Sequence, residues 1–135
     1  MQKTFDNPTS VAPPVSNSSH AVRVNVGDGA LIFVSGQGPQ DARRQVVGGA
    51  DLAAQTRQTF GNVRAILEAQ RATLGDVVKM TVDLTDMTRR AEMARVRGEF
   101  FPHDPPAATA VRVAALALPE LLIQVDVIAA AGRRA

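Results

Sequence analysis

The residues most able to do chemistry lie on two apolar segments near the carboxyl end of the chain, residues 106–113 and 121–129. Both segments are short, rich in Val and Ile and interspersed with polar residues, which is typical of β-strands. Side chains alternate across a strand, so Arg112 lies on one face of the first strand, while Gln124 and Asp126 share a face of the second. We expect the floor of any functional site to lie on these two strands.

Alanine occupies the other positions on the Arg112 face, at Ala108 and Ala110. Arg112 is four residues from Ala108, which is roughly 13 Å along a strand. Two interpretations of Arg112 therefore stay open. Its long side chain contacts a ligand, or it forms an ion pair with Asp126 or with a neighbouring subunit. For Arg97 on a predicted helix, a pocket role and a place on a solvated face both stay open.

Ser35 and His20 are candidates nearer the amino end of the chain. Ser35 ends an apolar strand, where its hydroxyl faces a ligand or makes a structural turn contact. No activating base is evident, so we do not predict a nucleophile. His20 has an ordinary pKa suited to proton transfer, with a surface or capping role as the alternative. No His and carboxylate pattern has metal-ligand spacing, so we predict no metal.

Length and composition indicate a single globular domain. The chain has 135 residues, 45% of them hydrophobic, and no cysteine, which excludes disulfides and is compatible with the cytoplasm, where we place the protein. No window approaches the roughly 18 apolar residues of a membrane span, and the first residues lack the apolar core of a signal peptide. Basic residues are scattered and aromatic residues are few, so we expect neither a membrane nor a nucleic-acid partner.

The chain divides into a lead-in segment, a domain and a short tail. Residues 1–19 are rich in Pro and Ser, which predicts a mobile arm or an extended segment. The domain proper spans residues 20–131, and residues 132–135 form a basic tail. Within the domain, strands over 21–26 and 30–36 flank a Gly-Asp-Gly turn and predict a hairpin.

Two helices and a further strand follow the hairpin. Asp51 is a plausible N-cap for a helix to about Ala72, and a second helix runs from about Arg89 to Phe101. Between them, residues 77–84 alternate as a strand does. One face carries Val78, Met80, Val82 and Leu84, and the other carries Lys79, Thr81 and Asp83.

This order of elements predicts a two-layer α+β fold, a mixed sheet with two helices on one face. The other face of the sheet still carries Met, Val, Ile and Ala. Such a face favours burial against another subunit, so we expect an oligomer.

Several motifs, in this order and spacing, resemble the RidA/YjgF family of enamine/imine deaminases over residues 13–129. They are Phe33-Val34-Ser35-Gly36-Gln37, Gln55-Thr56-Arg57-Gln58-Thr59 with Asn62-Val63, Asp76-Val77-Val78-Lys79, Leu84-Thr85-Asp86, Phe100-Phe101, Pro106-Ala107 with Val111, and residues 123–129. The resemblance implies a chorismate-mutase-like fold with a mixed six-stranded sheet. It also implies a homotrimer with small-molecule pockets at the subunit interfaces and no cofactor.

The resemblance also shows where this chain departs from the family pattern. The arginine that binds the substrate carboxylate falls on Ala108, within Pro106-Ala107-Ala108-Thr109. The glutamate thought to orient the attacking water falls on Gln124, which hydrogen-bonds a water but cannot accept its proton. The tyrosine of the amino-terminal segment falls on Ser18, and an asparagine of the second helix falls on Ala94. Ser35 and the Gly36 backbone remain.

These departures argue against ordinary 2-aminoacrylate deamination, because the lost charge-assisted carboxylate contact is worth on the order of 1.5–3 kcal/mol. The first hypothesis is a trimer that binds or processes a different small imine- or enamine-type metabolite. The alternatives are a non-catalytic ligand-binding or regulatory trimer and, ranked last, an endoribonuclease. The candidate catalytic residues are Ser35, Gln124 and His20, and the candidate binding residues are Ser18, Ser35, Gly36, Ala94, Ala108, Ala110, Arg112 and Gln124.

Overall fold

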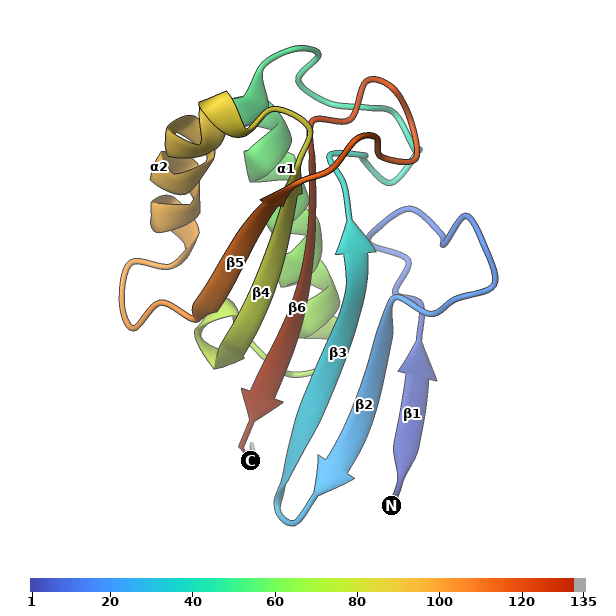
Figure 1. The fold of residues 1–135 in the computed structure, drawn as a ribbon. Helices are drawn as coiled ribbons and strands as arrows, with labels where there is room; N and C mark the ends of the chain where they lie inside the picture. The colour runs from blue at the N-terminus through green and yellow to red at the C-terminus, as the bar shows by residue number, and fades with distance from the viewer. Residues whose placement is uncertain (133–135) are drawn as a thin grey trace.

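Residues 1–132, which are those that the computed structural model describes, contain one six-stranded sheet in the order β1-β2-β3-β6-β4-β5 (Figure 1). Strands β4 and β5 are parallel and every other neighbouring pair is antiparallel, so the predicted mixed six-stranded sheet is confirmed. The strands are β1 (Lys3–Asp6), β2 (Ala21–Val26), β3 (Gly29–Gln37), β4 (Val77–Leu84), β5 (Ala107–Arg112) and β6 (Ile123–Ala131).

Helices α1 (Leu52–Ala69) and α2 (Arg90–Phe100) lie on one face of this sheet, as predicted (Figure 1). Asp51 caps α1 as expected, because its carboxylate accepts a hydrogen bond of 3.3 Å from the Ala54 N–H. Helix α1 contacts β3 and β6, the two central strands, and α2 packs against α1. The α+β class therefore follows from two helices that share one sheet face.

Strand β1 is the one strand that the sequence pattern did not locate. Its four residues pair antiparallel with β2, with Phe5 opposite Val22. So short a segment shows little alternation, and it lies inside the stretch 1–19 that we interpreted as an arm or extended segment. Of the predicted basic tail, Gly132 is described, and residues 133–135 lie outside the described residues.

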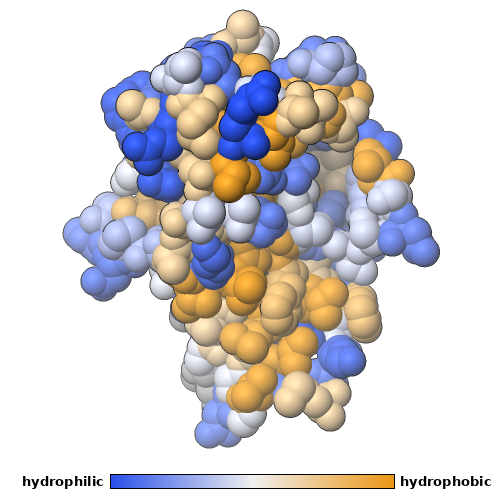
Figure 2. Space-filling model, viewed as in Figure 1, coloured by the Kyte–Doolittle hydropathy of each residue, from blue (hydrophilic) through white to orange (hydrophobic). Residues whose placement is uncertain are grey.

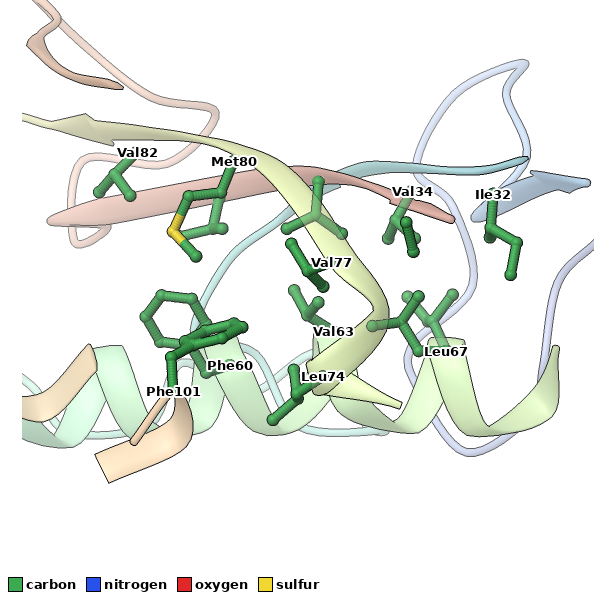
Figure 3. Close-up of a cluster of buried hydrophobic side chains, with 14 of the residues drawn as sticks. Ile32, Val34, Phe60, Val63, Leu67, Leu74, Val77, Met80, Val82 and Phe101 are labelled. Atoms are coloured by element: carbon green, nitrogen blue, oxygen red, sulfur yellow. The ribbon is translucent and has the colours of Figure 1, made fainter. Parts of the chain in front are cut away.

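The core lies between α1 and the sheet, where Figure 3 shows apolar side chains of both layers pointing toward one another. Phe60 is fully buried and stacks its ring near those of Phe100 and Phe101, with centroid distances of 5.5 and 5.7 Å. Such aromatic packing fixes α2, which carries Phe100, against α1.

The prediction that Val78 shares a face with Met80, Val82 and Leu84 is wrong. A register shift between Val77 and Lys79 marks a bulge at the start of β4. One extra residue reverses the alternation, so Val77 packs into the core and Val78 is 48% exposed. Met80, Val82 and Leu84 do share one face, as predicted, and that face is buried.

The sheet face away from the helices carries an apolar row across neighbouring strands. Its register places Phe5 beside Val22, Val22 beside Phe33 and Phe33 beside Ile128. Phe5 and Phe33 are 67% and 41% exposed, and Figure 2 shows apolar side chains gathered over this part of the sheet. Within residues 1–132, neither helix combines the length and the hydropathy that a membrane span requires.

Candidate functional site

A polar pocket of about 270 Å³ lies where the end of β3 meets the start of β6 and the amino-terminal segment. It brings together five of the residues singled out in the sequence: Ser18, His20, Ser35, Gly36 and Gln124. They come from three segments that are distant in sequence. The sheet order explains this, because β3 and β6 are direct neighbours.

A bulge in β3 shapes the floor of this polar pocket. The ladder with β6 is regular up to Val34 and resumes at Gln37, so Ser35 and Gly36 fall in the irregular step. A Cβ atom on Gly36 would lie 2.7 Å from the Cδ and Nε2 atoms of Gln124. Glycine at this position therefore lets the Gln124 side chain lie directly against the backbone of β3.

Ser35 is held in place by the carbonyl of His20. The Ser35 N–H donates to it at 2.9 Å, and the Ser35 hydroxyl donates to the same oxygen at 3.4 Å. The hydroxyl oxygen keeps lone pairs for accepting a hydrogen bond from a ligand. No base contacts the hydroxyl among the described hydrogen bonds, which fits a binding role better than a nucleophilic one.

Gln124 is half-buried and its side-chain amide makes no hydrogen bond within residues 1–132. It stands opposite Asp83 of β4 on the helix-free face. The amide is therefore free to hold a water or a ligand through both its N–H and its carbonyl oxygen. It still lacks the proton-accepting ability of a carboxylate.

His20 is the one titratable acid–base group with a pKa near neutrality that lines the described pocket, and it is only 3% exposed. Its imidazole bonds the Ala12 carbonyl, while Nδ1 is buried without a hydrogen-bond partner. Burial lowers the pKa of His20 below its ordinary 6.5, and the Ala12 bond and the Asp6 charge oppose that effect. The neutral imidazole is therefore the form that the fold favours.

This preference predicts a pH effect on stability. A histidine whose pKa is lowered by folding binds a proton more readily when unfolded, so stability falls as the pH drops below 6.5. We expect the free energy of unfolding, measured by urea titration, to decrease between pH 7.5 and 5.5. The decrease should be smaller in the His20→Gln variant. An equal decrease in both proteins would place the responsible group elsewhere.

Arg44 closes the outer wall of the polar pocket. Its guanidinium donates to the carbonyls of Pro13 and Pro14 at 3.1 and 3.4 Å, so it ties the amino-terminal segment to the loop after β3. Its backbone has a φ of 64°, which is unusual for a residue other than glycine. Arg44 was not among the residues predicted from the sequence, because nothing in the local pattern signals a left-handed arginine.

Asn62 of α1 holds the loop that follows β3, which forms part of the wall of the polar pocket. Its Nδ2 donates to the carbonyls of Gly38 and Gln40 at 3.0 and 2.8 Å, and its Oδ1 accepts from Gln58. The loop that follows β3 is thereby attached to the helix layer. An asparagine among the buried residues of a helix is the sequence signal that would have indicated this role.

A second, apolar pocket of about 210 Å³ lies between α2 and the edge strand β5. Ala108 and Ala94 line it, together with Arg97, which is its one charged residue in the described chain. Ala108 faces the helix layer, because its register partner Met80 is fully buried. The remaining lining residues are Met80, Gly98, Phe101, Pro105 and Pro106.

Two predicted site residues of β5 line neither pocket. Ala110 packs against the core, and Arg112 lies at the far end of the strand beside Leu84. Hydrogen bonds from Thr88 lower the pKa of Asp86, and the charge of Arg112 contributes a smaller part of that shift.

The alternative of an ion pair between Arg112 and Asp126 is not seen within the described chain. Asp126 pairs with Thr81 on the helix-free face, whereas Arg112 aligns with the buried Leu84. Burial raises the pKa of Asp126, and the like charge of Asp83 adds to the shift. Among residues 1–132, no three metal-ligating side chains cluster in a way that could hold a metal ion.

The two pockets share no residue and are separated in one chain by β6 and β4. The polar pocket holds most of the hydrogen-bonding groups and the Arg44 guanidinium, and the apolar pocket holds Arg97 and free volume.

The sequence matches one family model over residues 9–131, and that model is described as Endoribonuclease L-PSP. A RutC family protein of Pyrococcus horikoshii is 38% identical over 116 residues, which is 86% of this chain and 88% of that protein. The crystal structure of RidA from the Antarctic bacterium Psychrobacter sp. superposes with a TM-score of 0.83 at 31% identity, covering 93% of this chain and 98% of that one. The YjgF gene product of E. coli gives 0.81 at 30% identity, covering 97% and 99%.

Proposed function

Since this chain belongs to the L-PSP family that includes RidA and YjgF, we propose that it forms a homotrimer that binds and hydrolyses a small imine or enamine metabolite between its subunits. In that reaction a water adds to the imine carbon, the carbon–nitrogen bond breaks, and ammonia leaves with a 2-oxo acid as the other product. Imine hydrolysis needs no cofactor. The absence of cysteine is compatible with the cytoplasm as the setting.

The observation that carries this proposal is the polar pocket with its unpaired Gln124 amide. Gln124 and the Ser35 hydroxyl lie on adjoining strands and hold a water and the substrate nitrogen through hydrogen bonds. A protonated imine is already electrophilic, so placing a water against its carbon supplies much of the required catalysis. The open apolar row of Phe5, Val22, Phe33 and Ile128 supports the assembly of copies that such a site requires.

The proposed substrate is not 2-aminoacrylate itself. Ala108 replaces the arginine expected to bind its carboxylate, and Gln124 replaces the glutamate expected to orient its water. The apolar pocket at Ala108 is open rather than filled, so it has room for a larger substituent. A larger imine therefore fits this chain better than the smallest one.

Two alternative functions make different demands on the same pocket. A non-catalytic binder needs the cavity but no reaction. An endoribonuclease, the activity in the name of the matching family model, needs an acid and a base. The described lining of the polar pocket holds one imidazole, of His20, and no carboxylate, which favours the small-molecule proposal.

The test follows ammonia release from imines that an amino-acid oxidase generates in situ. We expect the purified protein to accelerate hydrolysis of the imines of valine and leucine above the buffer rate, and to leave 2-aminoacrylate near background. Gln124→Leu should remove the acceleration. Saturable binding without acceleration would support the non-catalytic alternative, and cleavage of a single-stranded RNA at equal protein concentration would support the endoribonuclease.

A further inference from the structure

Arg97 is the charged residue of an otherwise apolar pocket. It lies on α2 and lines the cavity with Met80, Phe101 and two prolines. Its side chain makes no hydrogen bond or ion pair within residues 1–132, and it is half-buried. A cation beside apolar walls and without an internal partner is well placed to bind an anion from outside the chain.

The acidic residue nearest along the helix does not neutralise Arg97. Glu99 forms an ion pair with Arg57 of α1 at 2.9 Å, with a second hydrogen bond from the same guanidinium at 3.1 Å. Glu92 is paired with Arg89 at 3.3 Å. Both glutamates of α2 are therefore occupied, and neither lines the apolar pocket.

Small side chains leave the space beside Arg97 free. Ala94 and Gly98 lie three residues before and one residue after it on α2, and Ala108 faces them from β5. Their cavity of about 210 Å³ compares with roughly 30 Å³ for each molecule of liquid water. The cavity is therefore large enough for a group of several heavy atoms. Its mostly apolar lining favours a hydrocarbon group.

We propose that Arg97 binds the carboxylate of the substrate and that the adjoining apolar pocket takes a branched aliphatic substituent of the same molecule. The ligand class is a 2-imino acid, or its 2-oxo acid product, with a side chain of the size of those of valine and leucine. This inference rests on the proposed function, and it adds the anchor and the specificity pocket to it. Arg97 then does from the helix what no residue of β5 does in this chain.

The chemistry of the two groups supports this assignment. A guanidinium presents a planar fork that donates two parallel hydrogen bonds to one carboxylate. Apolar surroundings strengthen such a contact relative to one in water. A straight or branched hydrocarbon next to the carboxylate removes apolar surface from water against Phe101 and Met80.

The test measures binding of stable 2-oxo acids by titration calorimetry on the intact protein. The probes are pyruvate, 3-methyl-2-oxobutanoate and the methyl ester of the latter. We expect 3-methyl-2-oxobutanoate to bind more tightly than pyruvate, and the uncharged ester to bind at least about tenfold more weakly. Arg97→Gln should weaken the acid by about 10- to 100-fold, since a lost charge-assisted contact has that effect.

Arg95→Gln is the matched control, because Arg95 is an exposed arginine on the same helix that does not line the pocket. Arg95→Gln should bind the acid as the parent does, and thermal unfolding should show that both variants are folded. Equal binding by Arg97→Gln and the parent would overturn the assignment of the anchor while leaving the proposed hydrolysis intact. Failure of the parent to bind either acid would overturn the ligand class, and the imine assay then decides the proposed function separately.

Discussion

Replacing Gln55 with alanine is expected to lower the free energy of unfolding by about 3 kcal/mol or more. Gln55 is fully buried at the start of α1. Its Nε2 donates to the carbonyls of Gly49 and Glu120 at 2.7 and 2.9 Å, and its Oε1 accepts from the Leu122 N–H at 2.8 Å. Alanine removes these three part-buried hydrogen bonds, each of which contributes about 1 kcal/mol, and it leaves a cavity where the buried Gln55 side chain was.

The measurement is urea unfolding of the parent, Gln55→Ala and Gln58→Ala. Gln58 lies on the same helix and makes one side-chain hydrogen bond, to Asn62, so its loss should cost less than about 1 kcal/mol. A change in midpoint at constant slope would show that stability alone has changed. Similar stabilities for the two variants would mean that water takes over the bonds of Gln55.

The same hydrogen bonds connect stability to the site. Gln55 holds residues 120 and 122, which lead directly into β6 and Gln124. The floor of the polar pocket is therefore fixed to the helix layer by a side chain that touches no ligand. Weakening this connection should loosen Gln124 together with the strand that carries it.

Local patterns in the sequence predicted the elements that depend on local physics. The hairpin of β2 and β3, the Asp51 cap and the presence of both helices follow from alternation, turn residues and helical spacing. Helix α1 ends at Ala69 rather than at the predicted Ala72, because the backbone of Arg71 is left-handed, with a φ of 59°. The misplaced Val78 has a different origin. Its orientation is decided by a bulge in the pairing with β6, a partner about 50 residues away in the sequence, and no local pattern contains that information.

The candidate site likewise depends on strand order, which no local sequence pattern contains. Ser35 and Gln124 lie on neighbouring strands, whereas Ala108 and Arg112 lie near opposite ends of an edge strand three positions away from β3. Sequence position indicated which face each residue occupies. It could not indicate that Ala108 shares a pocket with Arg97, since that contact depends on how α2 lies across β4 and β5.

Placing an arginine at Ala108 is expected to reverse the substrate preference. The new side chain would enter the apolar pocket beside Arg97, remove the volume that we assign to the branched substituent, and add a second guanidinium for the carboxylate. Binding of 3-methyl-2-oxobutanoate should weaken by at least about tenfold, and hydrolysis of 2-aminoacrylate should rise by about 10- to 100-fold, in line with one charge-assisted contact.

Ala108→Leu separates the two causes, because it fills the pocket without adding charge. It should weaken the branched acid as Ala108→Arg does and leave 2-aminoacrylate at the parent rate. If both variants keep full affinity for the branched acid, the substituent does not occupy this pocket. If Ala108→Arg fills the pocket but gains no activity on 2-aminoacrylate, the missing carboxylate at Gln124 is the stronger barrier, and Gln124→Glu in the same background should then release it.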